Sequence, residues 1–429
     1  MKIFLSTDIP NKAIVYYALQ LVAFNKLVQF SYVKDRSHAD LSVGIGNENT
    51  IQLSANFFAL LEKKITAPIE HLQLNGRVML PNGNTDYVST IFYYVNCIQE
   101  YYCNEFDRYG RFEFLNSAQH LFGVEGNFVQ QLIDEFFTAT NGLNRLPIKQ
   151  RPATAFLTHD IDFVYQAKNE DGMFALKNKR WFSIVRLLYN HYLGTPDWLN
   201  MPQIVSLEKK LGFTSNFFWL PIKNELNSDY DFSSSQIQEQ LEIVSSYGGT
   251  NHLHKAIGTT TFKEEMSLFK QLPLANRFHF LKFTVADFVH MAQAGIRVDS
   301  SLGFANNFGF RNSYGLPFMP FDLSTNSVLN LVEVPMQIMD RTFFNLNYTT
   351  TQVEKIIADW ILASNSNTVI TINWHNNFFS NLTYAGYERI YRNTLQLLRH
   401  NGIRSVSVED IIEEYGKQTY FQMPAELHS

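Results

Sequence analysis

From residue 153 onward, strand-like apolar runs alternate with amphipathic helical patterns along most of the chain. The strand-like runs cover residues 153–158, 213–220, 250–254, 277–282, 296–299, 331–336, 368–374 and 405–408. Helical patterns lie between most of them, at residues 236–247, 262–272, 285–294, 352–363 and 384–400. This alternation is typical of an α/β fold with a parallel sheet, and seven or eight such units favour a closed barrel. A doubly wound open sheet is the alternative.

The first third of the chain is less regular. Apolar residues recur at roughly helical spacing over residues 15–27, and short alternating runs at 39–43 and 51–54 predict strands. The composition changes near residues 141–144, shortly before two prolines, which is typical of a domain boundary. We therefore expect a smaller α/β amino-terminal domain at residues 1–145 and the barrel at residues 146–429.

Composition and charge exclude several classes of protein. The net charge of −5 offers no broad basic face, so we expect no nucleic-acid partner. No run of 18 apolar residues occurs, and no apolar stretch of signal-peptide length follows Lys2, so we expect neither a membrane span nor secretion by that route. Cys97 and Cys103 fit neither a disulfide framework nor a C-x-x-C motif. A reducing, cytoplasmic location is the simplest interpretation.

Ionisable residues gather at the carboxyl ends of the predicted strands. Along the chain these are Asp160 with Asp162, His252 with His254, Arg277 with His279, Asp299, Arg311 in a following loop, and His375. In a barrel these strand ends converge on one rim, where such folds place their chemistry. Their recurrence therefore predicts a site.

Asp160 and Asp162 alternate along one strand, and two like charges so close are costly unless a cation or a shared proton relieves them. A divalent metal on one carboxylate, with the other free as a general base, is one solution; a helix cap plus an exposed turn carboxylate is the alternative. His252 and His254 share a strand face, and a carboxylate with imidazoles is a common zinc ligand set that leaves a position for water. Either histidine alone is more often structural.

His375 follows a strongly apolar strand, where burial disfavours the imidazolium and a carboxylate such as Asp299 would favour it. That balance suits a general acid that protonates a leaving group, and a histidine bonded within its own loop is the alternative. Arg277 and Arg311 could orient Asp160 or bind substrate oxygens. Aromatic residues near the expected rim are candidate sugar contacts: Trp219, Tyr314 and Trp374.

Several short motifs of the second part follow one another in a familiar order. They are Leu-Thr-His-Asp-Ile-Asp at 157–162, Asp-Ser-Ser-Leu-Gly-Phe at 299–304, Gly-Phe-Arg at 309–311, Pro-Phe-Met-Pro-Phe-Asp at 317–322, Glu-Val-Pro-Met at 333–336 and Trp-His-Asn-Asn at 374–377. Together they resemble the polysaccharide deacetylase (NodB-homology, carbohydrate esterase family 4-like) family, in the branch with an L-T-H-D-V-D-like first motif. Residues 1–145 resemble the extra amino-terminal domain of that branch more weakly, chiefly through residues 107–112.

The resemblance implies a distorted barrel and a metal-dependent hydrolase that removes N-acetyl groups from a sugar or polysaccharide by attack of a metal-bound water. It implies that Asp160 is the general base, oriented by Arg277, and that His375 is the general acid. Asp162 and His254 match the metal ligands. The family usually supplies another histidine four residues after the first, where this chain has Gly258, so His279 or His252 is the candidate third ligand.

We accordingly expect a divalent metal, zinc first, a carbohydrate partner, and substrate contacts from Arg311, Asp299 and Trp374. A catalytically inactive glycan-binding protein and a hydrolase of another C–N bond are the alternatives.

Overall fold

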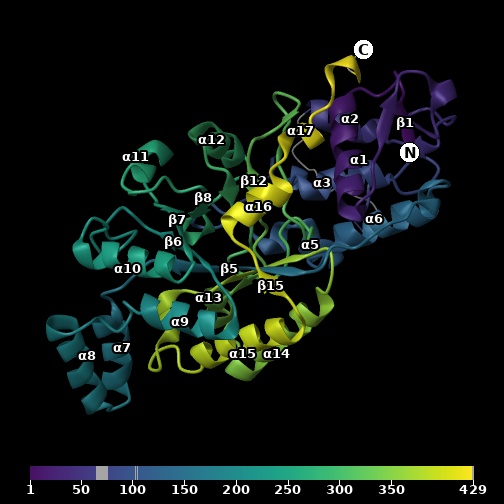
Figure 1. The fold of residues 1–429 in the computed structure, drawn as a ribbon. Helices are drawn as coiled ribbons and strands as arrows, with labels where there is room; N and C mark the ends of the chain where they lie inside the picture. Colours follow the sequence, from purple (N-terminus) through teal and green to yellow (C-terminus); the bar gives the residue numbers. More distant parts are fainter. Residues whose placement is uncertain (64–75, 102, 104, 428–429) are drawn as a thin grey trace.

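A curled sheet of parallel strands forms the centre of the larger part of the chain (Figure 1). The computed structural model describes residues 1–63, 76–101, 103 and 105–427. The strands run in the order β12-β9-β8-β7-β6-β5-β14-β13, with β15 pairing beside β5, and every neighbouring pair is parallel. Their bounds are β5 Thr154–Ile161, β6 Asn216–Trp219, β7 Thr250–Lys255, β8 Ala275–Phe278, β9 Val298–Asp299, β12 Val332–Glu333, β13 Ile338–Met339, β14 Val369–Asn373 and β15 Arg404–Ser405. The predicted parallel α/β fold is confirmed.

The sheet curls without closing into a complete barrel. No ladder joins β12 to β13 among the residues that the structure describes. Just before β13, the side chain of Gln337 accepts a bond from the backbone N–H of Thr371 at 2.6 Å and donates to the carbonyl of Val369 at 3.3 Å. One amide side chain thus occupies a pairing position on β14 where a strand backbone would otherwise lie. The distorted barrel that we expected is therefore a half-barrel with one open seam.

Helices connect the strands, and their buried stripes explain where they pack. On α15 (Tyr387–His400), Tyr387, Ile390, Tyr391, Thr394, Leu395 and Leu398 are buried at the three- and four-residue spacing of one helix face. The other helices after β6 are α10 Ser235–Ser246, α11 Phe262–Met266, α12 Asp287–Ala294, α13 Asp340–Asn345, α14 Thr350–Ala363, α16 Val408–Tyr415 and α17 Gln418–Phe421. Four of the five predicted helical patterns match closely, and the one at residues 262–272 ends early.

Two differences from the predicted elements bear on the site. The strand predicted at residues 277–282 ends at Phe278, because Phe280 and Leu281 take left-handed backbone angles with φ of 57° and 52°. Between β5 and α9 (Met201–Leu211), the chain forms a helical hairpin of α7 (Ala167–Lys177) and α8 (Trp181–Leu193) that we did not predict. This hairpin stands clear of the rest of the molecule in Figure 1.

The amino-terminal part has its own small sheet of parallel strands in the order β2-β1-β3-β4. The strands are β1 Lys2–Leu5, β2 Ser31–Val33, β3 Leu41–Gly44 and β4 Ile51–Gln52, and the helices are α1 Lys12–Lys26, α2 Ala55–Lys63, α3 Tyr87–Val95, α4 Ile98–Tyr101, α5 Ala118–Phe122 and α6 Phe128–Ala139. The predicted helix and the two predicted strands of this region are present. The smaller α/β unit expected before the barrel is thus confirmed as a fold class.

The two parts share one hydrophobic core. The largest cluster of buried apolar side chains runs from Ile3 to Met423 without a break between them. Tyr17 on α1 donates to the carbonyl of Met319 at 2.8 Å and packs its ring against Phe321. The boundary at 145/146 therefore separates two sheets but not two cores, and it stays a prediction as a domain limit. Within the described residues, no helix is both long and apolar enough to cross a bilayer.

Candidate metal and catalytic site

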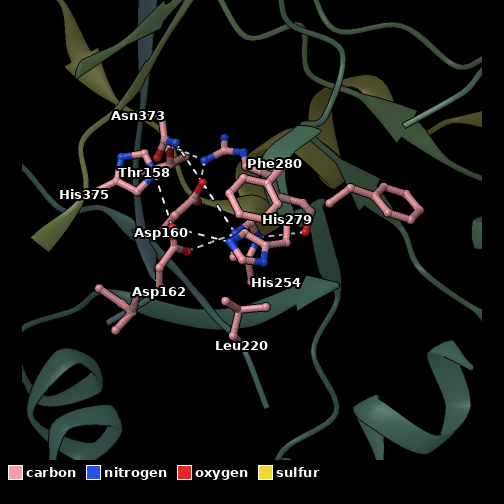
Figure 2. Close-up of polar contacts among 12 residues, drawn as sticks. Thr158, Asp160, Asp162, Leu220, His254, His279, Phe280, Asn373 and His375 are labelled. Carbon is pink, nitrogen blue, oxygen red and sulfur yellow. Dashed lines mark hydrogen bonds and ion pairs between the residues drawn. The ribbon is translucent and has the colours of Figure 1, made fainter. Parts of the chain in front are cut away.

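Three side chains from the ends of three strands of the sheet, one carboxylate and two imidazoles, lie close together (Figure 2). Asp162 follows β5, His254 lies near the end of β7, and His279 follows β8. Nε2 of His254 lies 3.3 Å from Oδ1 of Asp162, and Nε2 of His279 lies 3.7 Å from Oδ2. One donor atom from each of the three residues lies within 4.8 Å of the others. Parallel strands bring these residues together because their carboxyl ends share one edge of the sheet.

The chemistry of this trio fits a divalent cation. Oδ1 of Asp162 and Nε2 of His279 are buried and lack a hydrogen-bond partner, which is costly unless a ligand satisfies them. Nδ1 of His254 donates to the carbonyl of Arg277 at 2.9 Å, so its Nε2 is left to face Asp162. Nδ1 of His279 faces Oδ1 of Asn227 at 3.4 Å in the same way. One carboxylate and two imidazoles oriented from behind form a donor set typical of zinc.

The pKa values of the trio follow from burial and mutual charge. Burial raises the pKa of Asp162, but His279, His254 and His375 outweigh it and hold that pKa well below its usual range. Burial lowers the pKa of His254, yet Asp160 and Asp162 raise it above its ordinary value. At His279 burial dominates and the pKa is lowered. A negative carboxylate with imidazoles beside it attracts either protons or a metal ion, and the two compete.

The structure distinguishes between His252 and His279, the two candidates for the third ligand. His252 shares the strand face of His254 but lies two residues deeper, where its Nε2 contacts Oγ1 of Thr250 at 2.8 Å. Burial lowers the pKa of His252 to about 3, and its ring packs on Phe218. Gly258 lines a cavity of about 540 Å³ beside His279, and its φ of 145° is one that a histidine rarely adopts. His279, from the next strand, is therefore the imidazole that reaches Asp162.

Asp160, inside β5, is held by two partners at the same rim. Arg277 on β8 donates from Nη1 to Oδ1 at 2.8 Å, and Asn373 at the end of β14 donates from Nδ2 to Oδ2 at 2.8 Å. Burial raises the pKa of Asp160, but Arg277, His254 and His375 lower it below the ordinary value. The side chain is thus a fixed carboxylate. We predicted Arg277 beside Asp160 but missed Asn373, which the sequence offers only as the last residue of an apolar strand.

His375 lies on the opposite side of Asp162 from the two other histidines, with its Nε2 3.8 Å from Oδ2. Its Nδ1 donates to Oδ1 of Asp340 at 2.6 Å, and its backbone N–H donates to Oδ2 at 2.6 Å. Burial lowers the pKa of His375, but Asp340, Asp162 and Asp160 raise it to about 9. The expected carboxylate partner exists, but it is Asp340 rather than Asp299. Asp340 follows the two-residue strand β13, which leaves no pattern in the sequence.

The expected substrate contacts of Asp299, Arg311 and Trp374 are not supported, because all three side chains are fully buried. Asp299 accepts bonds from Asn276 at 2.8 Å and from the Ser301 hydroxyl at 2.9 Å. Arg311 forms a two-pronged ion pair with Glu100 of the amino-terminal part, at 2.8 and 2.5 Å.

The aromatic candidates for sugar contacts are buried as well. The Trp374 ring packs against Tyr387 and Tyr391 of α15. Trp219 and Tyr314 have 0% and 1% exposure, so neither presents a ring to a ligand. Their positions near the expected rim suggested contact with a sugar, but each of these rings faces the core.

The amino-terminal part reaches the loop that carries His279. Phe280 stacks on the His279 ring with centroids 4.0 Å apart, and on Tyr109 of the turn at residues 107–111 with centroids 6.0 Å apart. Arg111 of the same turn donates from Nη1 to the carbonyl of Phe280 at 2.9 Å and is held by Asp107. Two consecutive non-glycine residues with positive φ are strained. The turn therefore supports the conformation that aims His279 at Asp162.

Comparisons with solved structures give weak likenesses over about two thirds of the chain. No protein-family model and no curated protein sequence matches it. A Mycobacterium smegmatis protein assigned as a polysaccharide deacetylase is 12% identical, with a TM-score of 0.43, over 65% of this chain and 94% of its own. The PuuE allantoinase is 11% identical, with a TM-score of 0.40, over 63% and 91%. A mutant of the peptidoglycan deacetylase PdaC from Bacillus subtilis is 13% identical, with a TM-score of 0.31, over 62% and 92%. At this level the likenesses carry no argument about activity.

Proposed function

We propose that this protein is a metal-dependent hydrolase that removes N-acetyl groups from a sugar or polysaccharide. The observation that carries the proposal is the arrangement around Asp162, whose carboxylate faces His254, His279 and His375 at 3.3, 3.7 and 3.8 Å. A held carboxylate, Asp160, lies beside the same group, with its Oδ2 3.9 Å from Nε2 of His254. A base, a candidate metal site and an acid at one rim are what amide hydrolysis requires.

Each residue has a separate role in this proposal. Asp162, His254 and His279 would hold the cation, which when bound polarises a carbonyl and makes water more acidic. Asp160 accepts a proton from the water that attacks the acetamide carbon, and Arg277 and Asn373 hold it in place. The C–N bond then breaks, and His375 donates its proton to the departing amine nitrogen. Its pKa of about 9 keeps it protonated at neutral pH.

The motifs resembling those of polysaccharide deacetylases support an N-acetylated carbohydrate as the substrate and zinc as the metal. The expected cytoplasmic location rests on the two free cysteines and stays a prediction. Gly258, in place of the family's further histidine, motivates a glycan-binding protein without activity as the alternative, whereas His279 beside Asp162 supports a three-residue donor set. A hydrolase of another C–N bond would use the same residues, and the assay for acetate release distinguishes it from a deacetylase.

The test combines metal content with acetate release from a panel of N-acetylated oligosaccharides. Wild-type protein should contain about one divalent ion per chain by elemental analysis and should release acetate. Asp160→Asn should retain the metal but lose activity by about two to four orders of magnitude, because a general base contributes that much.

Three outcomes would count against the proposal. Acetate release that Asp160→Asn leaves unchanged would remove the assigned base. Stoichiometric metal without acetate release from any member of the panel would favour hydrolysis of another C–N bond, and absence of both would favour a binding protein.

A further inference from the structure

The hairpin of α7 and α8 exposes an unusual concentration of large apolar side chains. Nine of the 23 exposed large hydrophobic residues in the described chain lie on these two helices. On α8 only Leu187 is buried, and Phe182 and Leu193 are 84% and 78% exposed. The nine residues are Met173, Leu176, Trp181, Phe182, Val185, Leu188, Tyr189, Tyr192 and Leu193. A monomeric soluble protein rarely exposes so many large apolar side chains on one pair of helices without a partner.

The hairpin is also basic in a chain that is acidic overall. Residues 167–193 contain five Lys or Arg and two Asp or Glu, a net charge of +3, against −5 for the whole chain. Asp171 is buried, so it contributes little to the outer surface. Lys177, Lys179 and Arg180 are exposed at the tip, directly before Trp181 and Phe182. Basic residues next to exposed aromatic and aliphatic side chains are typical of surfaces that enter the headgroup region of a bilayer.

The base of the hairpin is fixed to the loop that follows β14. Asp171 of α7 accepts bonds from Nε1 of Trp198 at 3.0 Å, from the Ser380 hydroxyl at 2.8 Å and from the N–H of Thr383 at 3.0 Å. That loop begins at His375, and its Asn376 donates to the carbonyl of Phe163 at 2.8 Å. The hairpin is therefore held at the same rim as the candidate site, while its tip stands clear of the molecule (Figure 1).

We propose that the α7–α8 hairpin docks on the surface of a bilayer that contains anionic lipid. Its apolar side chains enter the interface, and the basic tip binds lipid phosphates. A second copy of the chain fits the same surface less well, because a twofold contact would bring two hairpins of charge +3 against each other. Docking would place the rim with Asp162 near the membrane, so substrates carried on lipids would be concentrated there.

The test is co-sedimentation of the full chain with vesicles, without any substrate. Binding should be clear with mixed phosphatidylcholine and phosphatidylglycerol vesicles, weak with phosphatidylcholine alone, and reduced by high salt. Phe182→Glu should weaken binding roughly tenfold or more, because it removes one large apolar side chain from the interface. The double variant Lys177→Glu with Lys179→Glu should weaken it about 25-fold or more, since each basic residue near such a surface contributes roughly fivefold.

The matched control is Leu362→Glu, an equally simple change of an exposed leucine on α14, which should bind as the wild type does. Circular dichroism checks that each variant is folded. The proposal is overturned if the wild type ignores the mixed vesicles, if Phe182→Glu binds them unchanged, or if neutral vesicles bind equally well. A dimer in sedimentation analysis that Phe182→Glu dissociates would replace the bilayer by a second copy. Because no substrate is present, failure here leaves the proposed hydrolase reaction untouched.

Discussion

Asp162 is the residue on which the electrostatics of the site converge. Its carboxylate is largely buried, yet its pKa is held well below the usual range because three imidazoles lie within 4 Å of its oxygens. Burying a charge is tolerated only where opposite charge or a metal ion compensates it. The imidazoles are divided between two tasks, since His254 and His279 are oriented by backbone or amide oxygens and His375 by a carboxylate. In the proposed function, that division would separate metal binding from proton donation.

Replacing His279 by glutamine should weaken zinc binding more than about tenfold, because loss of a residue that only orients a metal ligand already costs about that much. The matched control is His252→Gln, which changes a histidine of the same sheet whose Nε2 contacts Thr250 and which, among the described contacts, does not reach Asp162. Zinc titration against a competing chelator measures both. Equal affinities in the two variants would exclude His279 as a ligand.

Replacing Asp340 by asparagine should lower the pKa of His375 from about 9, because Asp340 is the largest influence that raises it. In the folded protein the pKa of His375 is raised above the ordinary value of a histidine, so the protonated imidazole stabilises the fold at neutral pH. The proton and the stabilisation that it brings are lost as pH rises through about 9. The Asp340→Asn variant should lose this proton, and its stabilising effect, at a lower pH. NMR titration of the imidazole resonances in metal-free protein measures the shift. If Asp299→Asn lowered the pKa of His375 and Asp340→Asn did not, Asp299 would be the partner of His375, as the sequence analysis expected.

At the scale of elements, the sequence predicted the strands that are buried on both faces and missed the turns that aim the side chains. β5 is buried along all eight residues, and its apolar residues at 155–157 make it recognisable in the sequence. Phe280 and Leu281 are apolar too, but their left-handed angles end the strand, and composition does not reveal that. Asn373 and Asp340 were missed because their partners lie 213 and 35 residues away, and only the fold brings them together.

The turn at residues 107–111 gives a prediction at this scale. Arg111→Ala removes the bond to the Phe280 carbonyl, so the strained loop should relax and zinc affinity should fall about tenfold, as it does when other supporting partners are lost. Arg108→Ala is the control, because Arg108 lies over the same Tyr109 ring but makes no bond to the loop among the described contacts. Zinc titration and thermal unfolding together separate a local change from global destabilisation. Equal zinc affinity in both variants would mean that the loop with Phe280 keeps its conformation without Arg111.

For the whole molecule, the ion pair of Arg311 with Glu100 joins the two parts in an almost fully buried position. The sequence predicted a division near residue 145 but not this junction, because apolar composition does not say which buried surfaces face each other. Tyr17 and Phe321 continue the same contact as part of the shared core. The amino-terminal part therefore packs directly against the larger part and shares its core.

Glu100→Gln should destabilise the protein by about 3 kcal/mol, because it leaves the Arg311 guanidinium buried without its counter-charge. Asp359→Asn, which breaks the exposed pair with Lys355, should change stability little. Urea unfolding followed by tryptophan fluorescence and by circular dichroism measures both. All five tryptophans lie beyond residue 146, so coincident transitions would show the two parts unfolding together, and separate transitions would contradict the shared core.

Gln337 has a consequence for how this sheet can vary. Its amide extends the pairing of β13 along β14 by bonding to Val369 and Thr371. A backbone ladder repeats its bonds at every second residue, whereas this side chain bonds β14 through one N–H and one oxygen at a single position. The separation between β14 and the chain just before β13 is thus set by the reach of a single glutamine. Shortening it to asparagine would draw β14, the strand that precedes His375, toward β13 or leave these two bonds unmade.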